Sequence, residues 1–375
     1  MLREPIHSRR FPGVSARSAK FLACGVVCLP ALLMSASSHA GTTIFRVKQG
    51  VCGTQPDGIN DSGVVTGYYM DSGGQPHGFV RAADGTVVVF DPTGSIDTQP
   101  ENINRDGTVT GEYEDPSFAF YGFVRTADGT IATFDAPKAT YTNGASINGK
   151  GVVTGQDTAK HSYDGFERQP GGNIRTVRVP GAFDTDPTSI NDSGAIAGAY
   201  AMSSGMPSHG FVRAADGSIA TFDPQGSINT DPQAINAGGV VAGDYEESSS
   251  TYHSFLRAAD GTLTQFDPPG AIGSFVTGLN NKGAVTGYYG TGSSSGSFVR
   301  EQDGSFREFN IGRSTGTAAT GINDSGAVTG YFENSNDLPV GFIRTPPLDG
   351  KTVRDDRDGG NAFSAPERQR PQNCD

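Results

Sequence analysis

The sequence predicts an all-β fold, a seven-bladed β-propeller of four-stranded antiparallel blades that an N-terminal strand closes. The first observation is a unit of about 44 residues that occurs seven times, each copy marked by an asparagine at Asn60, Asn104, Asn148, Asn191, Asn236, Asn280 and Asn323. The second is that a complete copy holds four short β-rich runs, the content of one propeller blade. The third is that the last copy lacks its fourth run, whereas an isolated run precedes the first copy.

Residues 1–40 are predicted to be a secretory signal peptide. Five basic residues precede an apolar stretch from Phe21 to Met34, and Ser38 and Ala40 are small residues at the positions that a signal peptidase inspects. No later segment reaches the roughly 20 apolar residues of a transmembrane helix. Removing the signal changes the formal net charge from −12 to −16, which disfavours nucleic acid and anionic lipid as partners. We therefore expect a secreted or cell-surface protein, with the periplasm as an alternative, and no transmembrane segment.

Turn residues separate the four runs of each copy. The first run ends at the marker asparagine, and a turn such as Asp192 to Gly194 leads into the second run, 64–69 in the first copy. A connection of variable length precedes the third run, for example His209 to Arg213, and an Ala-Ala-Asp-Gly turn leads into the fourth, Ser218 to Phe222. This order predicts an antiparallel meander in every copy.

Alternation along the runs predicts the core. The third run places a phenylalanine in every copy, and most fourth runs end in another, so these rings are expected to be buried. A glycine lies inside every second run, at Gly67, Gly111, Gly155, Gly198, Gly243, Gly287 and Gly330. A glycine inside a strand indicates a close approach, and we expect a neighbouring blade to pack there beneath an aromatic side chain.

The two ends of the array predict how the ring closes. Residues 42–47 form the isolated run, and we expect them to pair beside 340–344 and complete the seventh blade. The alternative is that Lys351 to Val353 supply this strand. The propeller is thus expected to span 41–346, followed by a polar, disordered tail at 347–375. Cys52 and Cys374 are expected to be either linked to each other or both free.

The run from Gly321 to Tyr331, combined with His-Gly-Phe at His77 and His209 and a short Asp-Gly turn, resembles the bacterial HAF-type extracellular repeat family. The resemblance covers about residues 43–345. It implies export and a β-rich repeat domain, and it brings no catalytic residues. Tyr121 and Asp164 are among the residues that replace the histidine in other copies, which argues against a metal or catalytic role shared by all blades.

Repeated polar residues allow a chemical and a structural interpretation. The histidines could bind a metal or hydrogen-bond at the start of a strand, and the Asn-Asp-Ser-Gly turns could bind calcium or cap themselves. The acids of the Phe-Asp motifs could serve a glycosidase or cap turns; they are Asp91, Asp135, Asp223 and Asp267. Because they recur from blade to blade, the structural interpretation is favoured in each case, and no metal, cofactor or catalytic residue is predicted.

Any ligand is expected on the face that carries the variable connections. The connections between runs two and three, and those between blades, vary in length and lie at the same end of an antiparallel blade. The candidate ligand-binding residues are Phe118, Phe120, Tyr121, Asp157, Tyr163, Asp164 and Tyr252. The favoured function is a non-catalytic scaffold that binds a glycan, a protein or a matrix partner. The alternative is a secreted polysaccharide hydrolase or lyase on the same scaffold.

Overall fold

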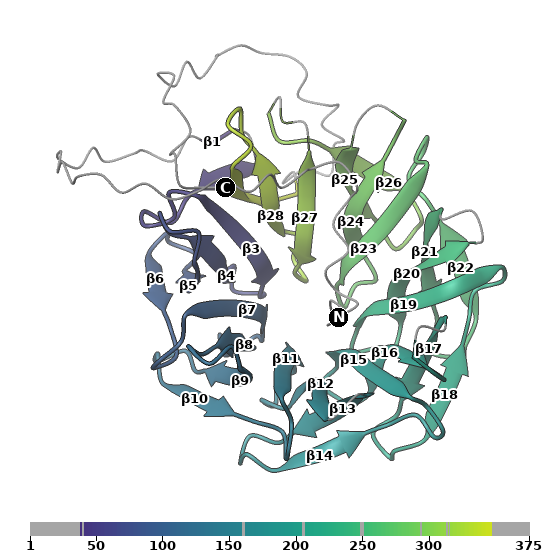
Figure 1. Cartoon of the computed structure of the whole chain (residues 1–375). Coiled ribbons are helices and arrows are strands. Elements are labelled where there is room, and N and C mark those ends of the chain that lie inside the picture. Colours follow the sequence, from purple (N-terminus) through teal and green to yellow (C-terminus); the bar gives the residue numbers. More distant parts are fainter. Residues whose placement is uncertain are drawn as a thin grey trace, which may run out of the picture.

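The computed structural model describes residues 38–39, 41–159, 162–204, 207–247, 251–292, 295–312, 314 and 316–346, and these residues form strands and turns without a helix (Figure 1). The expected signal peptide lies outside the described residues except for Ser38 and His39. The expected tail at 347–375 and the alternative closing strand at 351–353 also lie outside them.

Seven antiparallel blades surround a common axis, and a parallel bridge joins blades 2 and 3 into one sheet (Figure 1). Within each blade the strand nearest the axis comes first in the lists below. Blade 1 contains β3 (Gly53–Ile59), β4 (Val65–Met70), β5 (Pro76–Arg81) and β6 (Val87–Phe90). Blade 2 contains β7 (Asp97–Ile103), β8 (Val109–Glu114), β9 (Phe120–Arg125) and β10 (Ile131–Phe134). Blade 3 contains β11 (Tyr141–Ile147), β12 (Val153–Ala159), β13 (Ser162–Arg168) and β14 (Ile174–Val177).

Blade 4 contains β15 (Asp184–Ile190), β16 (Ile196–Ala201), β17 (Ser208–Arg213) and β18 (Ile219–Phe222). Blade 5 contains β19 (Ser227–Ile235), β20 (Val241–Glu247), β21 (Tyr252–Arg257) and β22 (Leu263–Phe266). Blade 6 contains β23 (Gly273–Leu279), β24 (Val285–Gly290), β25 (Ser295–Arg300) and β26 (Phe306–Phe309). Blade 7 contains β27 (Thr317–Ile322), β28 (Val328–Glu333), β29 (Pro339–Arg344) and β2 (Thr42–Phe45). The predicted seven-bladed propeller is confirmed.

The N-terminal strand closes the ring as predicted. β2 pairs antiparallel with β29, with Thr42 opposite Arg344 and Phe45 opposite Gly341. A short strand, β1 (Ser38–His39), pairs in turn with β2. Because β1 precedes the expected cleavage site after Ala40, cleavage there would leave β2 as the outermost strand of blade 7.

The predicted core phenylalanines lie between the blades. Those of the third strands are fully buried, and each ring on a fourth strand meets the next blade edge to face, as Phe90 meets Phe123 at 5.7 Å between centroids. Six arginines at the ends of third strands lie over the phenylalanine of the preceding blade, at 4.8–5.0 Å from the ring centroid. Blade 3 ends its fourth strand with Val177, so Arg213 has no ring to cover and pairs with Glu167 at 3.3 Å.

The role predicted for the glycines of the second strands is wrong in one respect. A Cβ at Gly67 would lie 2.2 Å from the carbonyl oxygen of Gln55 and 2.7 Å from the Cα of Pro56, both on the inner strand of the same blade. The inner strand carries a β-bulge here, which pushes its backbone toward the second strand. The glycine therefore accommodates its own blade and not a neighbouring one. A phenylalanine ring of the same blade is among the nearest neighbours at Gly243, Gly287 and Gly330, for example Phe255 Cζ at 2.8 Å from a Cβ at Gly243.

Cys52 is buried and forms a disulfide. The other three cysteines, Cys24, Cys28 and Cys374, lie outside the described residues. The alternative that Cys52 and Cys374 are both free is therefore wrong, and the pairing of Cys52 with Cys374 remains a prediction.

Candidate binding site at the central channel

The seven marker asparagines form a closed ring of hydrogen bonds around the axis. The side-chain Nδ2 of each donates to the backbone carbonyl of the asparagine in the next blade, at 2.9–3.2 Å, and Asn323 completes the ring by donating to Asn60. The Oδ1 of Asn60 accepts from the backbone N–H groups of Ser62 and Val64. This confirms the self-capped turns, and it adds a contact between blades that the sequence pattern did not predict.

Arg105 bridges three consecutive blades just beyond this ring. It follows Asn104 in blade 2, and its Nη1 donates to Asp192 Oδ2 of blade 4 at 2.9 Å. It passes over Gly149 of blade 3, where an added Cβ would lie 2.7 Å from the guanidinium carbon. Asp192 Oδ1 also accepts from the backbone N–H of Gly149. The turn end of the channel is therefore bridged by side chains of blades 2 and 4.

Inside the ring lies a cavity of about 690 Å³, within the usual range for ligand sites. Among the described residues, its lining includes one basic side chain, Arg105, which is already paired. The acids that line it are Asp57, Asp61, Glu101, Asp186, Asp192, Asp231, Asp244 and Asp324. Asp186, Asp231 and Asp244 are buried. Such a wall attracts cations and repels anions.

Several carboxyl groups in and around blade 2 have raised pKa values. Desolvation by burial, followed by the charge of Glu101, raises the pKa of Asp57 well above its usual value. Glu112, one strand farther from the axis, is opposite Gln99 in the ladder. Burial and then Glu101 raise the pKa of Glu112 to about 8, although a hydrogen bond from Tyr141 lowers it. The pKa of Asp97 rises to about 6, chiefly through burial.

Aromatic side chains lie at the opposite end of the channel from Arg105. Tyr252 lines the cavity and packs on Phe275 at 4.9 Å, and Phe275 stacks on Tyr288 at 5.2 Å. Phe120 packs on Tyr141 at 5.5 Å, and these two residues also form a parallel bridge between blades 2 and 3.

Of the seven predicted ligand-binding residues, only Tyr252 lines the central cavity. Phe118 lies in the turn between β8 and β9 with 75% of its surface exposed and a φ of 63°. Tyr121 stacks on Tyr113 at 5.4 Å, and the charge of Asp115 raises its pKa. Phe120 lies beside Tyr141. These residues share the expected face but form separate groups.

The other three predicted residues form a second group, in blade 3. Asp157 is opposite Asp164 in the ladder, and burial followed by the Asp164 charge raises the pKa of Asp157 to about 6. Asp164 pairs with Arg178 at 3.0 Å. The backbone N–H of Tyr163 donates to Asp184 Oδ1 at 2.9 Å. The Asp164 carboxylate and the Tyr163 backbone thus have partners within the protein.

The acids of the inner strands were missed by the sequence analysis. They occupy two positions that vary between copies. One precedes the residue opposite the second-strand glycine, as Asp231 precedes Pro232, and the other is the bulge residue after it, as in Asp57. The sequence feature that could have revealed them is that an acid occurs at each position in some copies and not in others.

The repeated histidines hold their own blades together. The Nδ1 atom of each histidine is hydrogen-bonded to the aspartate that follows the fourth strand. The distances are 2.8, 2.8 and 2.7 Å for His77, His209 and His253. Each also packs on a tyrosine at 5.3–5.4 Å. The hydrogen-bonding interpretation is confirmed. Among the described residues, no cluster of histidine, cysteine, aspartate and glutamate has the arrangement of a metal site.

The Phe-Asp aspartates do not act as the predicted turn caps. In three blades the carboxylate accepts from a hydroxyl on the inner strand of the next blade, at 2.6–2.8 Å; the donors are Thr142, Thr230 and Ser274. The acid thus links the outer strand of one blade to the inner strand of the next.

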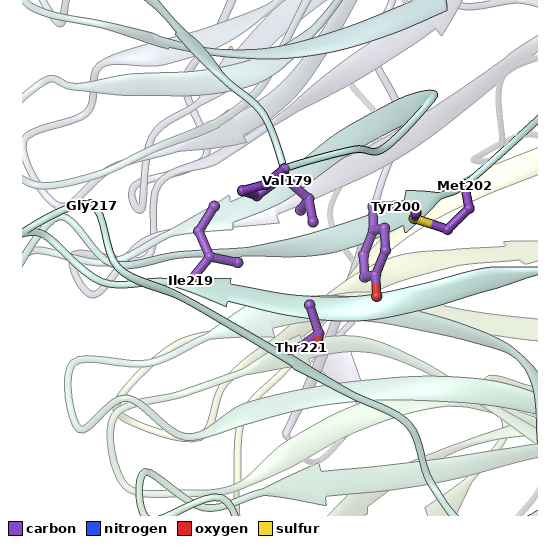
Figure 2. A pocket seen from close by; sticks show the side chains of 7 residues that line it. Val179, Tyr200, Met202, Gly217, Ile219 and Thr221 are labelled. Atoms are coloured by element: carbon purple, nitrogen blue, oxygen red, sulfur yellow. The ribbon is translucent and has the colours of Figure 1, made fainter.

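A second hollow, of about 440 Å³, lies on the outside of blade 4 (Figure 2). Tyr200, Met202 and Thr221 face it, together with Val179 from the loop after β14. It has no charged side chain, and Tyr200 is already packed on His209. The charged central channel is therefore the stronger candidate site.

No protein-family model and no curated protein matches this chain. Solved structures do resemble it. A streptogramin B lyase aligns with a TM-score of 0.54 and 14% identity over 82% of this chain and 100% of that one. The propeller domain of the Trilobed protease from Pyrococcus furiosus aligns with a TM-score of 0.54 and 10% identity over 80% and 95%. A prolyl endopeptidase aligns with a TM-score of 0.58 and 12% identity over 80% of this chain and 51% of that one. These likenesses show the β-propeller fold alone. None of the described residues lies in a helix long and apolar enough to cross a membrane.

Proposed function

We propose that this chain is a secreted or cell-surface scaffold without catalytic activity, which binds a positively charged protein segment at the loop face and in the central channel. The observation that carries the proposal is the lining of the channel, with eight carboxylates against one guanidinium that is already paired. Export rests on the sequence of residues 1–40 and on the resemblance to extracellular repeats.

A protein partner fits this face better than a neutral glycan does. Phe118 and Ile272 lie on connections and expose 75 and 65% of their surfaces, and Ile228, near the start of β19, exposes 41%. Apolar side chains around an acidic centre complement a segment that combines basic and apolar residues. Neutral sugars would leave the carboxylates without a counter-charge.

The test uses two peptides of equal length and apolar content, one carrying lysine and arginine and the other carrying glutamate. The protein should bind the basic peptide and not the acidic one, and the affinity should fall as salt is raised. Equal binding of both peptides, or binding that salt leaves unchanged, would refute the proposal.

A second candidate, a hydrolase or lyase acting on polysaccharide, is favoured by one observation. Glu112 has a pKa raised to about 8 and is hydrogen-bonded to Tyr141, so it is protonated at neutral pH as a general acid must be. Because the channel is acidic, the substrate would be neutral or cationic. Release of reducing ends from such a polysaccharide, abolished by Glu112→Gln, would support this candidate and displace the first.

A further inference from the structure

The central cavity reaches past the inner strands at blades 4, 5 and 6. In these blades the residue after the second-strand glycine lines the cavity; these residues are Ala199, Asp244 and Tyr288. The equivalent residues of the other four blades do not line it; they are Tyr68, Glu112, Gln156 and Tyr331. Alanine is the smallest side chain at this position, so the wall is set back at Ala199. We call the part of the cavity bordered by Ala199, Asp244 and Tyr288 the side recess.

Buried carboxylates line the side recess on blades 4 and 5. Asp231 is directly opposite Asp244 in the ladder of blade 5, and Asp186 occupies the position of Asp231 in blade 4. Asp186, Asp231 and Asp244 expose only 4, 9 and 5% of their surfaces. Thr188, two residues after Asp186, donates at 2.7 Å to the carbonyl of the residue after Asp231, so the two inner strands meet beside the acids. Like charges directly opposite each other destabilise a sheet, and a bound cation would relieve this repulsion.

Aromatic rings line the side recess where blades 5 and 6 meet. Tyr252 packs on Phe275 at 4.9 Å, Phe275 stacks on Tyr288 at 5.2 Å, and all three line the cavity. Tyr252 is opposite Glu246, two residues along β20 from Asp244, so Tyr252 and Asp244 share one face of blade 5. A cation beside these carboxylates can therefore also contact an aromatic ring.

A buried amide oxygen is evidence for a ligand that does not depend on the acids. Asn143 lines the cavity in blade 3 at the position that Asp186 has in blade 4, and it exposes 8% of its surface. The inner strands of these two blades are joined by a hydrogen bond from the backbone N–H of Ile190 to Ser146 at 3.4 Å. The Oδ1 of Asn143 is closed off from solvent and accepts no hydrogen bond from the described residues. A buried acceptor without a donor costs free energy, and a ligand that donates would supply the missing bond.

These features favour a guanidinium group over other cations. A metal ion needs ligands that converge on one point, and the described residues contain no such cluster. Buried acceptors require the ligand to give up its hydration, and a guanidinium is more weakly hydrated than an ammonium group. Its five donors lie in one plane and can reach acceptors on several strands, whereas an ammonium group has three donors on one nitrogen. The plane also packs on aromatic rings.

We propose that Asn143, Asp186, Asp231 and Asp244 form a subsite for a guanidinium group, the side chain of an arginine in the bound segment. This inference rests on the proposed function and adds the residue type that the channel recognises. The protein's own Arg105 is held at the turn end of the channel by its pair with an aspartate of blade 4, away from the side recess.

The repeat supplies the variants for the test. Asp186→Asn installs the residue of blade 3, Asn143, and Ala199→Tyr installs the residue of blades 1, 6 and 7, which fills the recess. Asp61→Asn is the matched control, because Asp61 lines the same cavity at its turn end. Blade 6 carries Asn281 there, which accepts a backbone hydrogen bond as Asp61 does. Thermal unfolding checks that each variant folds, and Asp186→Asn keeps the test decisive if Ala199→Tyr does not.

The probes are three acetylated peptides with two lysines among apolar residues, identical except for a central arginine, lysine or citrulline. Citrulline has the shape of arginine without its charge. Binding is measured by fluorescence anisotropy with the exported protein at low salt. The parent protein should bind the arginine peptide about tenfold more tightly than either of the others. Asp186→Asn and Ala199→Tyr should reduce this preference to less than about threefold, and Asp61→Asn should retain it.

The outcomes that contradict the inference differ from those that contradict the proposed function. If the preference for arginine persists in Asp186→Asn and Ala199→Tyr, or is lost equally in Asp61→Asn, the subsite is refuted and the proposed function stands. If the parent protein binds the arginine and lysine peptides equally, the selection of a guanidinium is refuted, and the proposed function again stands. If none of the three peptides binds, both proposals fail.

Discussion

Replacing Glu112 with glutamine should make the stability of the propeller less dependent on pH. The folded state holds the Glu112 proton up to a pKa of about 8, whereas the usual value is 4.5. Between these values the folded state binds more protons than the unfolded state, so stability falls as pH rises. The stabilising difference is fully present below about pH 4.5 and is lost as pH rises through about 8.

The structure gives the size of the effect. A pKa of about 8 against 4.5 corresponds to at most about 5 kcal/mol at pH 9, and to about 1.4 kcal/mol at pH 5.5. Relaxation of the protein around the newly charged carboxylate lowers its cost, so we expect the change between these two pH values to be about 2 kcal/mol. The amide of Glu112→Gln carries no charge and can still accept the hydrogen bond from Tyr141. The variant should therefore gain about 2 kcal/mol relative to the parent protein between pH 5.5 and 9.

Urea unfolding at pH 5.5, 7 and 9 measures this change. The chain has no tryptophan and 12 tyrosines, so tyrosine fluorescence and circular dichroism are suitable probes. Asp97 also titrates in this window, but it is present in both proteins and largely cancels in the difference. Parallel stability curves for the parent protein and Glu112→Gln would refute the reasoning, as would an equal pH effect in Asp106→Asn, a control for the loss of one charge in an exposed turn.

Three further predictions concern contacts between blades. Asn323→Ala should destabilise the protein by about 2–4 kcal/mol, because it breaks the ring at the closing blade and uncaps its turn; a loss in urea unfolding well below that of Asn148→Ala would mean that the ring is not closed. Glu167→Gln should lower the free energy of unfolding by about 1–2 kcal/mol, because the ion pair with Glu167 replaces the aromatic contact that the equivalent arginines make. Glu301→Gln, which breaks the more exposed ion pair with Arg307, should lower it by less than about 1 kcal/mol. Gly149→Val should displace Arg105 and cost about 1–3 kcal/mol, and this cost should shrink in the background of Arg105→Ala; additive effects in that double-mutant cycle would show that the two residues do not meet.

The fold could be predicted from the sequence because the features that fix it recur. Each of the seven copies repeats the marker asparagine, the glycine of the second strand and the phenylalanine of the third, and a displaced run at 42–47 identified the closing strand. Repetition did not reveal which surface each residue contacts. The packing of Gly67 against its own inner strand depends on a bulge, and a bulge at Pro56 to Gly58 leaves no mark in the hydrophobic alternation.

The candidate site was harder to predict because it depends on residues that do not recur. Aromatic and acidic side chains on variable connections indicated the loop face, and Tyr252 was found in this way. Four of the channel acids, Asp57, Glu101, Asp186 and Asp231, lie on the inner strands instead, where only structural roles were expected. Asp57 and Glu101 come near each other only because the blades are arranged in a ring. The spacing of the two residues along the chain does not reveal this.

The inner strands can diverge for a physical reason. A change at the second-strand glycine forces a Cβ into backbone, and a change at a third-strand phenylalanine empties the space between two blades, so both positions are constrained. The bulge residue is different. It contributes one hydrogen bond when it is threonine, as in Thr320, and losing that bond costs about 1 kcal/mol. Its side chain also borders the cavity. The propeller can therefore exchange a bulge threonine for an acid such as Asp57 without changing the contacts of the glycine or the phenylalanine, and each exchange adds a titratable group to the wall of the channel. This makes the seven bulge positions the part of the repeat at which a ligand preference can be changed with least effect on the fold.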